Sequence, residues 1–285
     1  MKKLFALLVT CALILATGCG SGSKTPDEPK TSDNEPLKLG TVKYLNVSET
    51  LFNSYFEKAA ARMEQTSSLR APKHIFFDNM TSMLAALEAK QIDALTTYQC
   101  VGEYLAAQNS ACEVTTKGVP KISDSFCCAM LEKNAALKKE FDDAIAKLTD
   151  DGTLAKIAKT YITDANFNDL PAVDMPKFDG AQTIKVAVTG DLPPLDFVRA
   201  DGTPAGFNTA VLAAISQQLG KNFELVDIDS GARAVALTSG EVDVVFWVAV
   251  PLDDTIVPTD FDRPEGMIIT APYFTDEIVH VQLKK

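Results

Sequence analysis

The stretch "TIKVAVTGDLPPLDFVRADGTPAGFNTAVLAAISQQLG" (residues 183–220) decides the fold, because it combines three local signals in one run. Its apolar first residues predict a strand, and the Pro, Asp and Gly residues in its middle predict a turn-rich loop. Residues 207–220 repeat apolar side chains at helical spacing and close on Gly220, which is typical of a helix end. A strand, a loop and a helix in this order predict the first step of a parallel α/β sheet.

The same alternation of strand and helix occurs twice along the chain. Before the loop-like stretch 166–182, strands followed by helices are predicted at 37–44, 74–78 and 91–98, and a short strand and two more helices follow within 126–165. After that stretch the pattern restarts at residue 183. Two α/β systems of similar make-up predict two lobes that hold a ligand between the C-terminal ends of their strands.

The N-terminus predicts export. Two lysines precede the apolar run 4–15, which is too short to span a membrane and reads as a signal peptide (1–18). Small residues directly before Cys19 resemble a lipobox, so Cys19 is expected to be acylated; an inert Cys19 after ordinary signal cleavage is the alternative. Residues 19–36 are polar and rich in Ser and Pro, which predicts a disordered tether. We therefore expect a lipid-anchored protein on the extracytoplasmic face of the cell membrane.

Charge and residue counts exclude several partners. The formal net charge of −11 argues against nucleic acid, and against binding to an anionic membrane surface through broad electrostatics. His74 and His280 lie far apart and no CxxC pair is present, so neither a metal site nor a cofactor is predicted. Four cysteines follow the anchor position: Cys100, Cys112, Cys127 and Cys128. Export permits a disulfide among them, and buried thiols are the alternative.

Residues 37–285 resemble the bacterial extracellular solute-binding proteins, family 3, of polar amino-acid ABC importers. The stretch 186–220 is similar to the family's N-terminal opening, "ALTSGEVDVV" (236–245) to its next helix–strand step, and "APYF" (271–274) to its signature before the first hinge strand. "LEAKQIDAL" (87–95) and residues 134–162 look like its second lobe and C-terminal helices. The resemblance implies the type II periplasmic-binding fold, a two-lobe α/β clamshell.

The resembling stretches occur in swapped order, as in a circular permutant. On this interpretation residues 37–125 are the second lobe, 126–165 return to pack on the first lobe, 166–182 are a linker, and 183–285 are the first lobe. Permutation is tolerated where the original termini lie close together at a surface. The new C-terminus would fall at a hinge.

The resemblance also implies ligand-binding residues. Arg263 stands nine residues before Pro272, where the family has an arginine that grips a carboxylate, and a guanidinium forms a bidentate clamp of this kind. Asn46 and Ser48 lie at the family's carboxylate-binding turn before a helix. A surface ion pair for Arg263 and a plain helix cap for Asn46 or Ser48 are the alternatives.

Other positions depart from the family. Tyr98 replaces the aspartate that binds an amino group, and Leu192 replaces an aromatic residue in the loop that also holds Asp191 and Phe197. Trp247, the single tryptophan, either contacts ligand or belongs to the core. These departures favour a carboxylate-bearing solute, such as an organic acid, over a standard α-amino acid.

The function expected is therefore capture of a small polar or carboxylate-bearing solute by a monomer that delivers it to an ABC permease, without catalysis. Two alternatives remain open. A dehydratase on the same scaffold would need a general acid near the clamp, for which Asp191, Asp196 and Asp260 are the candidates. A ligand-sensing lipoprotein without transport is the other.

Overall fold

The computed structural model describes residues 35–63, 71–116 and 122–284. The predicted signal peptide, Cys19 and the tether up to residue 34 lie outside these residues. Residues Pro36–Lys285 form one compact unit, of the mixed α/β class expected from the sequence. Among the residues described, no helix is both long and apolar enough to cross a bilayer.

The unit has two halves. The N-half comprises residues 36–116 and the end of the last strand, β13 (Phe274–Leu283). Its elements are β1 (Lys38–Val42), α1 (Glu49–Met63), β2 (Lys73–Phe77), α2 (Met80–Glu88), β3 (Ala94–Tyr98), α3 (Gln99–Gln108) and β4 (Cys112–Thr115). Strand β1 pairs in parallel with both β2 and β3, as short helical crossovers between strands require.

The C-half comprises residues 122–277. Its central strands are β5 (Ser123–Leu131), β6 (Thr183–Val188), β10 (Asn222–Asp227), β11 (Val244–Pro251) and β12 (Met267–Ile269). Its longer helices are α4 (Ala135–Asp150), α5 (Thr153–Ala158), α6 (Phe207–Leu219) and α7 (Arg233–Ser239). Strand β11 lies between β6 and β5 and is almost wholly buried, which explains its nearly continuous apolar sequence.

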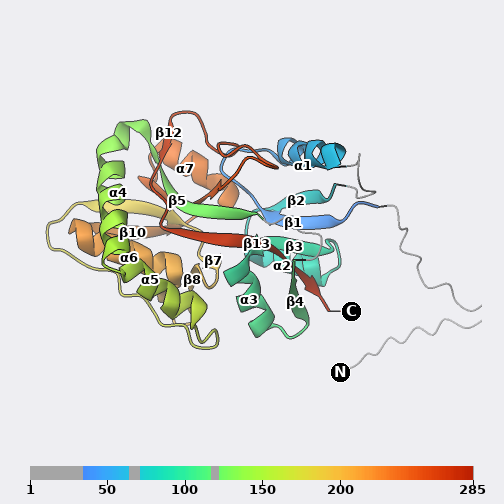
Figure 1. The fold of residues 1–285 in the computed structure, drawn as a ribbon. Helices are drawn as coiled ribbons and strands as arrows, with labels where there is room; N and C mark the ends of the chain where they lie inside the picture. Colours follow the sequence, from blue (N-terminus) through green and yellow to red (C-terminus); the bar gives the residue numbers. More distant parts are fainter. Residues whose placement is uncertain (1–34, 64–70, 117–121, 285) are drawn as a thin grey trace, which may run out of the picture. The chain divides into compact units, whose positions relative to one another are not determined.

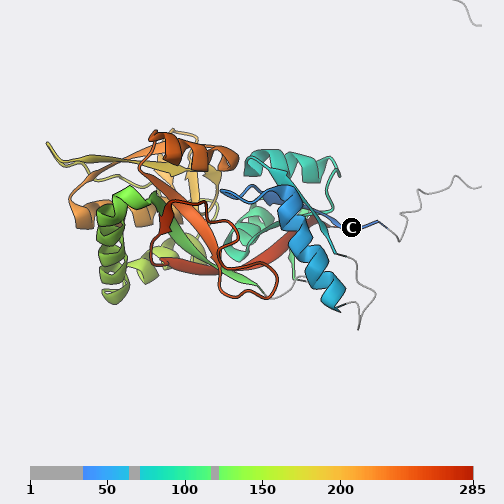
Figure 2. The ribbon, with the colours of Figure 1, turned by 90° about the horizontal axis from the view of Figure 1, so that it is seen from above.

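Strand β13 links the two halves. Residues 274–277 pair with β5 in the C-half, and residues 278–283 pair with β3 and β4 in the N-half. Figures 1 and 2 show this strand, in red, running from one half into the other. The chain passes between the halves at one further place, between β4 and β5. The expectation that the C-terminus ends at a hinge is therefore corrected: the final strand continues into the N-half and completes its sheet.

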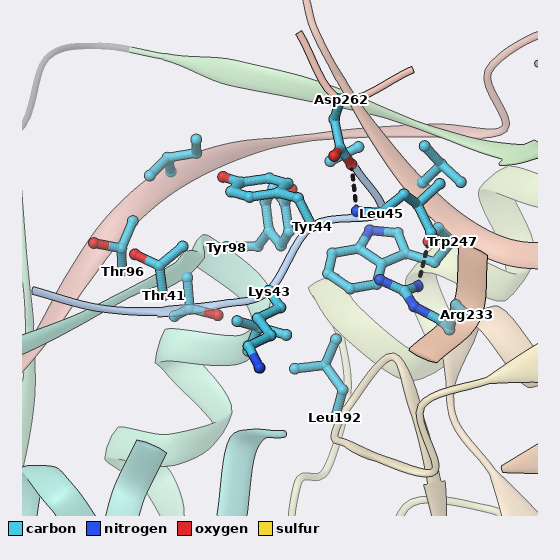
Figure 3. Close-up of a pocket in the computed structure, with 15 residues that line it drawn as sticks. Thr41, Lys43, Tyr44, Leu45, Thr96, Tyr98, Leu192, Arg233, Trp247 and Asp262 are labelled. Carbon is cyan, nitrogen blue, oxygen red and sulfur yellow. Dashed lines mark hydrogen bonds between the residues drawn. The ribbon is translucent and has the colours of Figure 1, made fainter. Parts of the chain in front are cut away.

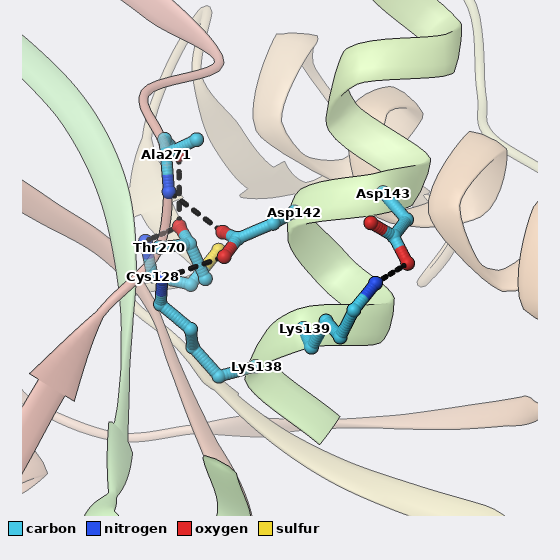
Figure 4. A network of polar contacts seen from close by, with 7 residues as sticks. All are labelled: Cys128, Lys138, Lys139, Asp142, Asp143, Thr270 and Ala271. Carbon is cyan, nitrogen blue, oxygen red and sulfur yellow. Dashed lines mark hydrogen bonds and ion pairs between the residues drawn. The ribbon is translucent and has the colours of Figure 1, made fainter. Parts of the chain in front are cut away.

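Two carboxylates of helix α4 bind other parts of the C-half: Glu140 pairs with Lys221, and Asp142 binds the backbone before β13. Asp142 accepts hydrogen bonds from the Ala271 backbone N–H at 2.8 Å and from Lys138 Nζ at 2.6 Å (Figure 4). Beside it, Thr270 Oγ1 accepts from the Cys128 N–H at 3.0 Å. The apolar stripe of α4, Phe141, Ala144, Ile145 and Leu148, is buried. The helix therefore packs with its apolar face inward, and charged residues such as Lys139 and Asp143 remain exposed to water.

Two features differ from the patterns read in the sequence. Residues 191–205 form a small antiparallel sheet of β7 (Asp191–Leu192), β8 (Asp196–Val198) and β9 (Pro204–Ala205) where only a loop is predicted. Gly206 ends it with φ +111°, and a Cβ there would lie 2.4 Å from the Leu195 carbonyl oxygen, so only glycine fits. In the stretch 166–182, Leu170 and Val173 are buried, so this segment packs against the C-half in part.

Candidate functional site

A cavity of about 50 Å³ lies between the two halves (Figure 3). Its N-half wall comes from the end of β1 with the following turn and from the end of β3; its C-half wall comes from β11, the start of α7 and the loops after β6 and β11. The residues with polar or aromatic groups in this wall are Thr41, Lys43, Tyr44, Thr96, Thr97, Tyr98, Arg233, Trp247 and Asp262. Both halves thus contribute to one concave, partly open space, which is typical of a small-molecule site.

Arg233 supplies a buried guanidinium. It begins α7 on the same face as the buried Ala236 and Leu237, and its side chain is 3% exposed. Its Nη1 donates to the Trp247 carbonyl at 2.7 Å and its Nε to the Ser230 carbonyl at 3.4 Å. No carboxylate among the described residues lies within ion-pair distance of it. Burial lowers the pKa of this guanidinium, because a low-dielectric site disfavours the charged form.

Trp247 is held in an uncommon backbone conformation. Its φ is +62°, and the pairing of β11 with β5 shifts register at this residue, between Phe246 and Val248. Such a bulge re-aims a side chain, and a left-handed non-glycine residue stores strain of about 1 kcal/mol or more. The indole faces the cavity with the Arg233 guanidinium 5.3 Å from its ring centre. Its buried Nε1 has no hydrogen-bond partner.

Tyr98 forms the opposite aromatic wall. Its ring stands edge-on to that of Trp247 at 5.7 Å, and its hydroxyl donates to Asp124 Oδ2 at 2.8 Å. Burial raises the pKa of Tyr98 well above its ordinary value and that of Asp124 to about 6. The Tyr98 hydroxyl therefore donates its proton to the hydrogen bond with Asp124 and not into the cavity. Nearby, the buried Thr96 Oγ1 has no hydrogen-bond partner.

Asp262 places a carboxylate in the same wall. Its Oδ2 accepts from the Leu45 N–H at 2.8 Å, and its Oδ1 accepts from the N–H groups of Asn46 at 2.7 Å and Val47 at 3.0 Å. The side chain is 5% exposed. Burial raises the pKa of Asp262, and the three backbone hydrogen bonds oppose that rise. The loop from the C-half is thereby fixed to the N-half.

The rim of the cavity carries further contacts between the halves. Asp191 Oδ2 accepts from Thr81 N at 3.0 Å and from Thr81 Oγ1 at 3.1 Å. Asn79 donates to Asp229 at 3.0 Å, also across the rim. These groups are exposed and exchange readily with water.

The structure separates the predicted site residues into two groups. Tyr98, Leu192 and Trp247 lie in the cavity wall, and their contact with ligand stays a prediction. Asp191 contacts Thr81 at the rim. Phe197 does not line this cavity; it lines one hollow of the C-half and another to which α3 of the N-half contributes. Ser48 Oγ caps α1 by accepting from the Leu51 N–H at 3.2 Å. Asn46 contributes its backbone N–H to Asp262 while its side chain is exposed.

The placement of Arg263 is corrected by the structure. Its side chain is exposed and does not line the cavity between the halves. Successive turns, Phe261 N–H to Pro258 O and Arg263 N–H to Asp260 O, point Phe261 and Asp262 inward and Arg263 outward. Counting back from Pro272 finds an arginine in the long loop 252–266, but does not reveal which way this loop turns.

Sequence reasoning missed Arg233 and Asp262. Arg233 could have been found from its helical spacing, because it shares the face of Ala236 and Leu237, and an arginine on an apolar face needs an explanation. No local signal identifies Asp262, whose partners lie more than 200 residues away in sequence.

The fold and cavity define an α/β protein of two halves around a concave, partly polar space, which is the general design of small-solute binding proteins. Residues 184–251 match the model of the bacterial extracellular solute-binding proteins, family 3. The resemblance to this family is thus confirmed for the stretch from β6 to β11. No curated protein matches the sequence at a significant level.

Solved structures show a more distant likeness. The ligand-binding core of GluR0 in complex with L-glutamate is 10% identical, with 89% of this chain and 87% of that chain covered and a TM-score of 0.41. A putative L-cystine ABC transporter from Listeria monocytogenes is 11% identical, with 88% and 84% covered and a TM-score of 0.39. A nutrient-binding protein from Burkholderia cenocepacia bound to methionine is 14% identical, with 86% and 84% covered and a TM-score of 0.38. Similarity at this level does not identify a ligand.

Proposed function

We propose that the protein captures a small carboxylate-bearing or polar solute between its two halves and delivers it to the permease of an ABC importer. The observation that carries this proposal is the buried Arg233 guanidinium, which faces the cavity without a carboxylate partner among the described residues. A buried charge is costly unless it is paired. An anionic solute would supply the missing partner, and the free Trp247 indole N–H would add a second donor.

Capture needs no covalent step. The chain connects the halves only through β13 and the link between β4 and β5, so they can separate once the hydrogen bonds of Asp262 and of the rim are broken. A solute held by Arg233 from one side and by Thr96 from the other would favour the closed arrangement by its differential affinity for it. Entry requires separation, because the closed cavity is only about 50 Å³.

The three carboxylates that were candidates for the general acid of a dehydratase do not line the cavity. Asp191 is engaged at the rim, and Asp260 is exposed. Asp196 is buried and accepts from Thr189, Gly190 and Asn208. None of these three carboxylates lines the cavity, so none is in reach of a solute bound there.

We also propose that the protein is held at the extracytoplasmic face of the membrane by acylated Cys19. The support is the leader-like sequence 1–18 followed by the lipobox pattern and the polar stretch 19–36. Membrane fractionation with and without detergent tests this.

Titration calorimetry with the compact unit, residues 36–285, tests solute capture. A panel of organic acids and α-amino acids should contain at least one ligand with a Kd below about 1 mM. Arg233→Gln, which keeps most of the side-chain volume, should weaken that ligand about tenfold to a hundredfold, since a hydrogen bond to a charged group contributes about 1.5–3 kcal/mol. The exposed Arg263 provides the matched control, and Arg263→Gln should bind like the wild type.

The opposite pattern would exclude this site. If ligand binding survives Arg233→Gln but is lost in Arg263→Gln, the solute binds outside this cavity. Circular dichroism of both variants separates lost binding from lost folding.

A further inference from the structure

A carboxylate of the chain itself already occupies the densest set of backbone donors in the cavity wall. Three consecutive N–H groups, from Leu45 to Val47, converge on Asp262 at 2.7–3.0 Å. Successive backbone N–H groups that point at one centre form an anion-binding nest, and their bonds to a carboxylate are charge-assisted. This turn therefore has the geometry to hold any carboxylate, and it holds Asp262.

The loop that carries Asp262 is anchored beside the turn. Phe261 packs edge-on against Tyr44 with ring centres 5.0 Å apart, and it belongs with Val257 to a buried cluster that includes Phe52 and Val47. Asp262 itself is 5% exposed. Because apolar contacts hold both sides of the loop, the carboxylate is fixed in the turn without help from a solute.

The remaining donors suit one anionic group. Arg233 keeps its guanidinium toward the cavity, and the indole N–H of Trp247 next to it has no partner. Asp262 is the only acidic residue among those that line the cavity, and both its oxygens already accept N–H bonds. An ammonium group would therefore have to share Asp262 with the three backbone N–H groups that already donate to it.

We propose that Asp262 is a specificity-determining residue: it fills the backbone nest at 45–47, leaves Arg233 and Trp247 as the single anion site, and so selects a small monocarboxylate over an α-amino acid. This inference rests on the proposed function and narrows its ligand class. On this inference, loop 252–266 places the Asp262 carboxylate in the nest at 45–47, where a second carboxylate of a ligand could otherwise bind.

Acetate and glycine test the selectivity, because they differ only by the ammonium group. Calorimetry on the compact unit, residues 36–285, should show one acetate per molecule and at least tenfold weaker binding of glycine. Asp262→Ala empties the nest and should bind two acetates. Asp260→Ala removes an exposed carboxylate from the same loop and should keep one.

Thermal unfolding adds a second readout. Asp262→Ala should unfold at a lower temperature than the wild type, and acetate should restore more of this loss than chloride at equal ionic strength. Asp260→Ala should show no such specific rescue. If Asp262→Ala folds only when acetate is present, the nest has been filled from outside and the inference is supported. If it fails to fold even with acetate, the inference is contradicted.

Other outcomes would overturn the role of Asp262 without touching solute capture. Glycine binding as tightly as acetate, or a single acetate site in Asp262→Ala, would remove the selectivity. Solute capture by the cavity would still stand in either case, provided that Arg233→Gln weakens the bound solute. Only binding that is independent of Arg233 would overturn the proposed function itself.

Discussion

Trp247 combines several constraints in one residue: a left-handed backbone at φ +62°, a buried indole and a cation 5.3 Å from its ring. A β-bulge aims it into the cavity instead of into the sheet packing. Strain of this kind persists only where the surroundings enforce it, and it concentrates at functional sites.

We expect the emission of Trp247 to report solute binding, because it is the only tryptophan in the chain. A solute against Arg233 should change the fluorescence with the same Kd as calorimetry. Trp247→Phe should abolish the signal and weaken an anionic solute about tenfold or more, since one N–H donor to a charged group is lost. Unchanged affinity in Trp247→Phe would remove the indole N–H from the ligand contacts.

At the residue scale, sequence reasoning found the aromatic part of the site but not the charged part. Tyr98 and Trp247 end or interrupt buried strands, so their place follows from the strand pattern. Arg263 was expected to bind the ligand because of its spacing from Pro272 alone. Spacing does not predict the direction of a side chain in a loop as long as 252–266. The contact between Asp262 and the turn at 45–47 depends on tertiary structure, which no local pattern encodes.

Among the elements, the N-half sheet carries an unusual polar row beneath α1. His74 on β2 lies with Nδ1 2.9 Å from Thr41 Oγ1 on β1, and His280 on β13 pairs opposite Thr96 on β3. Burial lowers the pKa of His74 to about 3, with a further contribution from His280, and lowers that of His280 to about 4. Both rings therefore stay neutral in the folded chain at neutral and mildly acidic pH.

This row predicts acid lability. Below a pH of about 6.5 the unfolded chain protonates its histidines while the folded chain does not, so stability present above that pH is lost as pH falls toward the folded pKa values. From pH 7 to pH 5 we expect His74 to cost about 2 kcal/mol. The free energy of unfolding in urea should thus fall more for the wild type than for His74→Gln. The raised pKa of Asp124 opposes the trend in both proteins and cancels in this difference. Parallel pH profiles would contradict the assignment.

The element pattern itself was largely readable from the sequence. Strands and helices with clear periodicity, such as β6, α6 and β11, appear where expected. Strand β4 and the small sheet of β7–β9 were missed, because four or fewer residues per strand give no measurable period. Strand β13 pairs with β5 in one half and with β3 and β4 in the other. Periodicity in the sequence does not identify the strands with which a strand pairs.

At the scale of the whole molecule, the proposed acylation of Cys19 predicts how the protein partitions between membrane and aqueous fractions. The full chain should fractionate with membranes and be released by detergent, since acyl chains anchor a protein without spanning the bilayer. Cys19→Ser should be released without detergent and should lack the mass of the lipid. Cys11→Ser, which alters only the removed leader, should behave like the wild type. Release of the unaltered chain without detergent would contradict the anchor.

The swapped order of the lobes stays a prediction. The family model covers residues 184–251, within the C-half, and does not reach the segments assigned to the second lobe. A family member whose strand order begins at the counterpart of β6 and ends at that of α5 would establish the permutation. A member that begins at the counterpart of β1 would refute it.

The contacts at the mouth of the cavity have a consequence for how the cargo leaves. Thr81 with Asp191 and Asn79 with Asp229 are exposed pairs, so separating them exchanges each hydrogen bond for one to water at a net loss of about 1 kcal/mol or less. These two pairs mark where the N-half and the C-half meet at the rim, but they contribute little to the stability of that contact. If the proposed capture of a solute is right, opening the cavity must also release Asp262 from the turn at 45–47, so the hydrogen bonds of this carboxylate and the contacts of the solute together govern unloading.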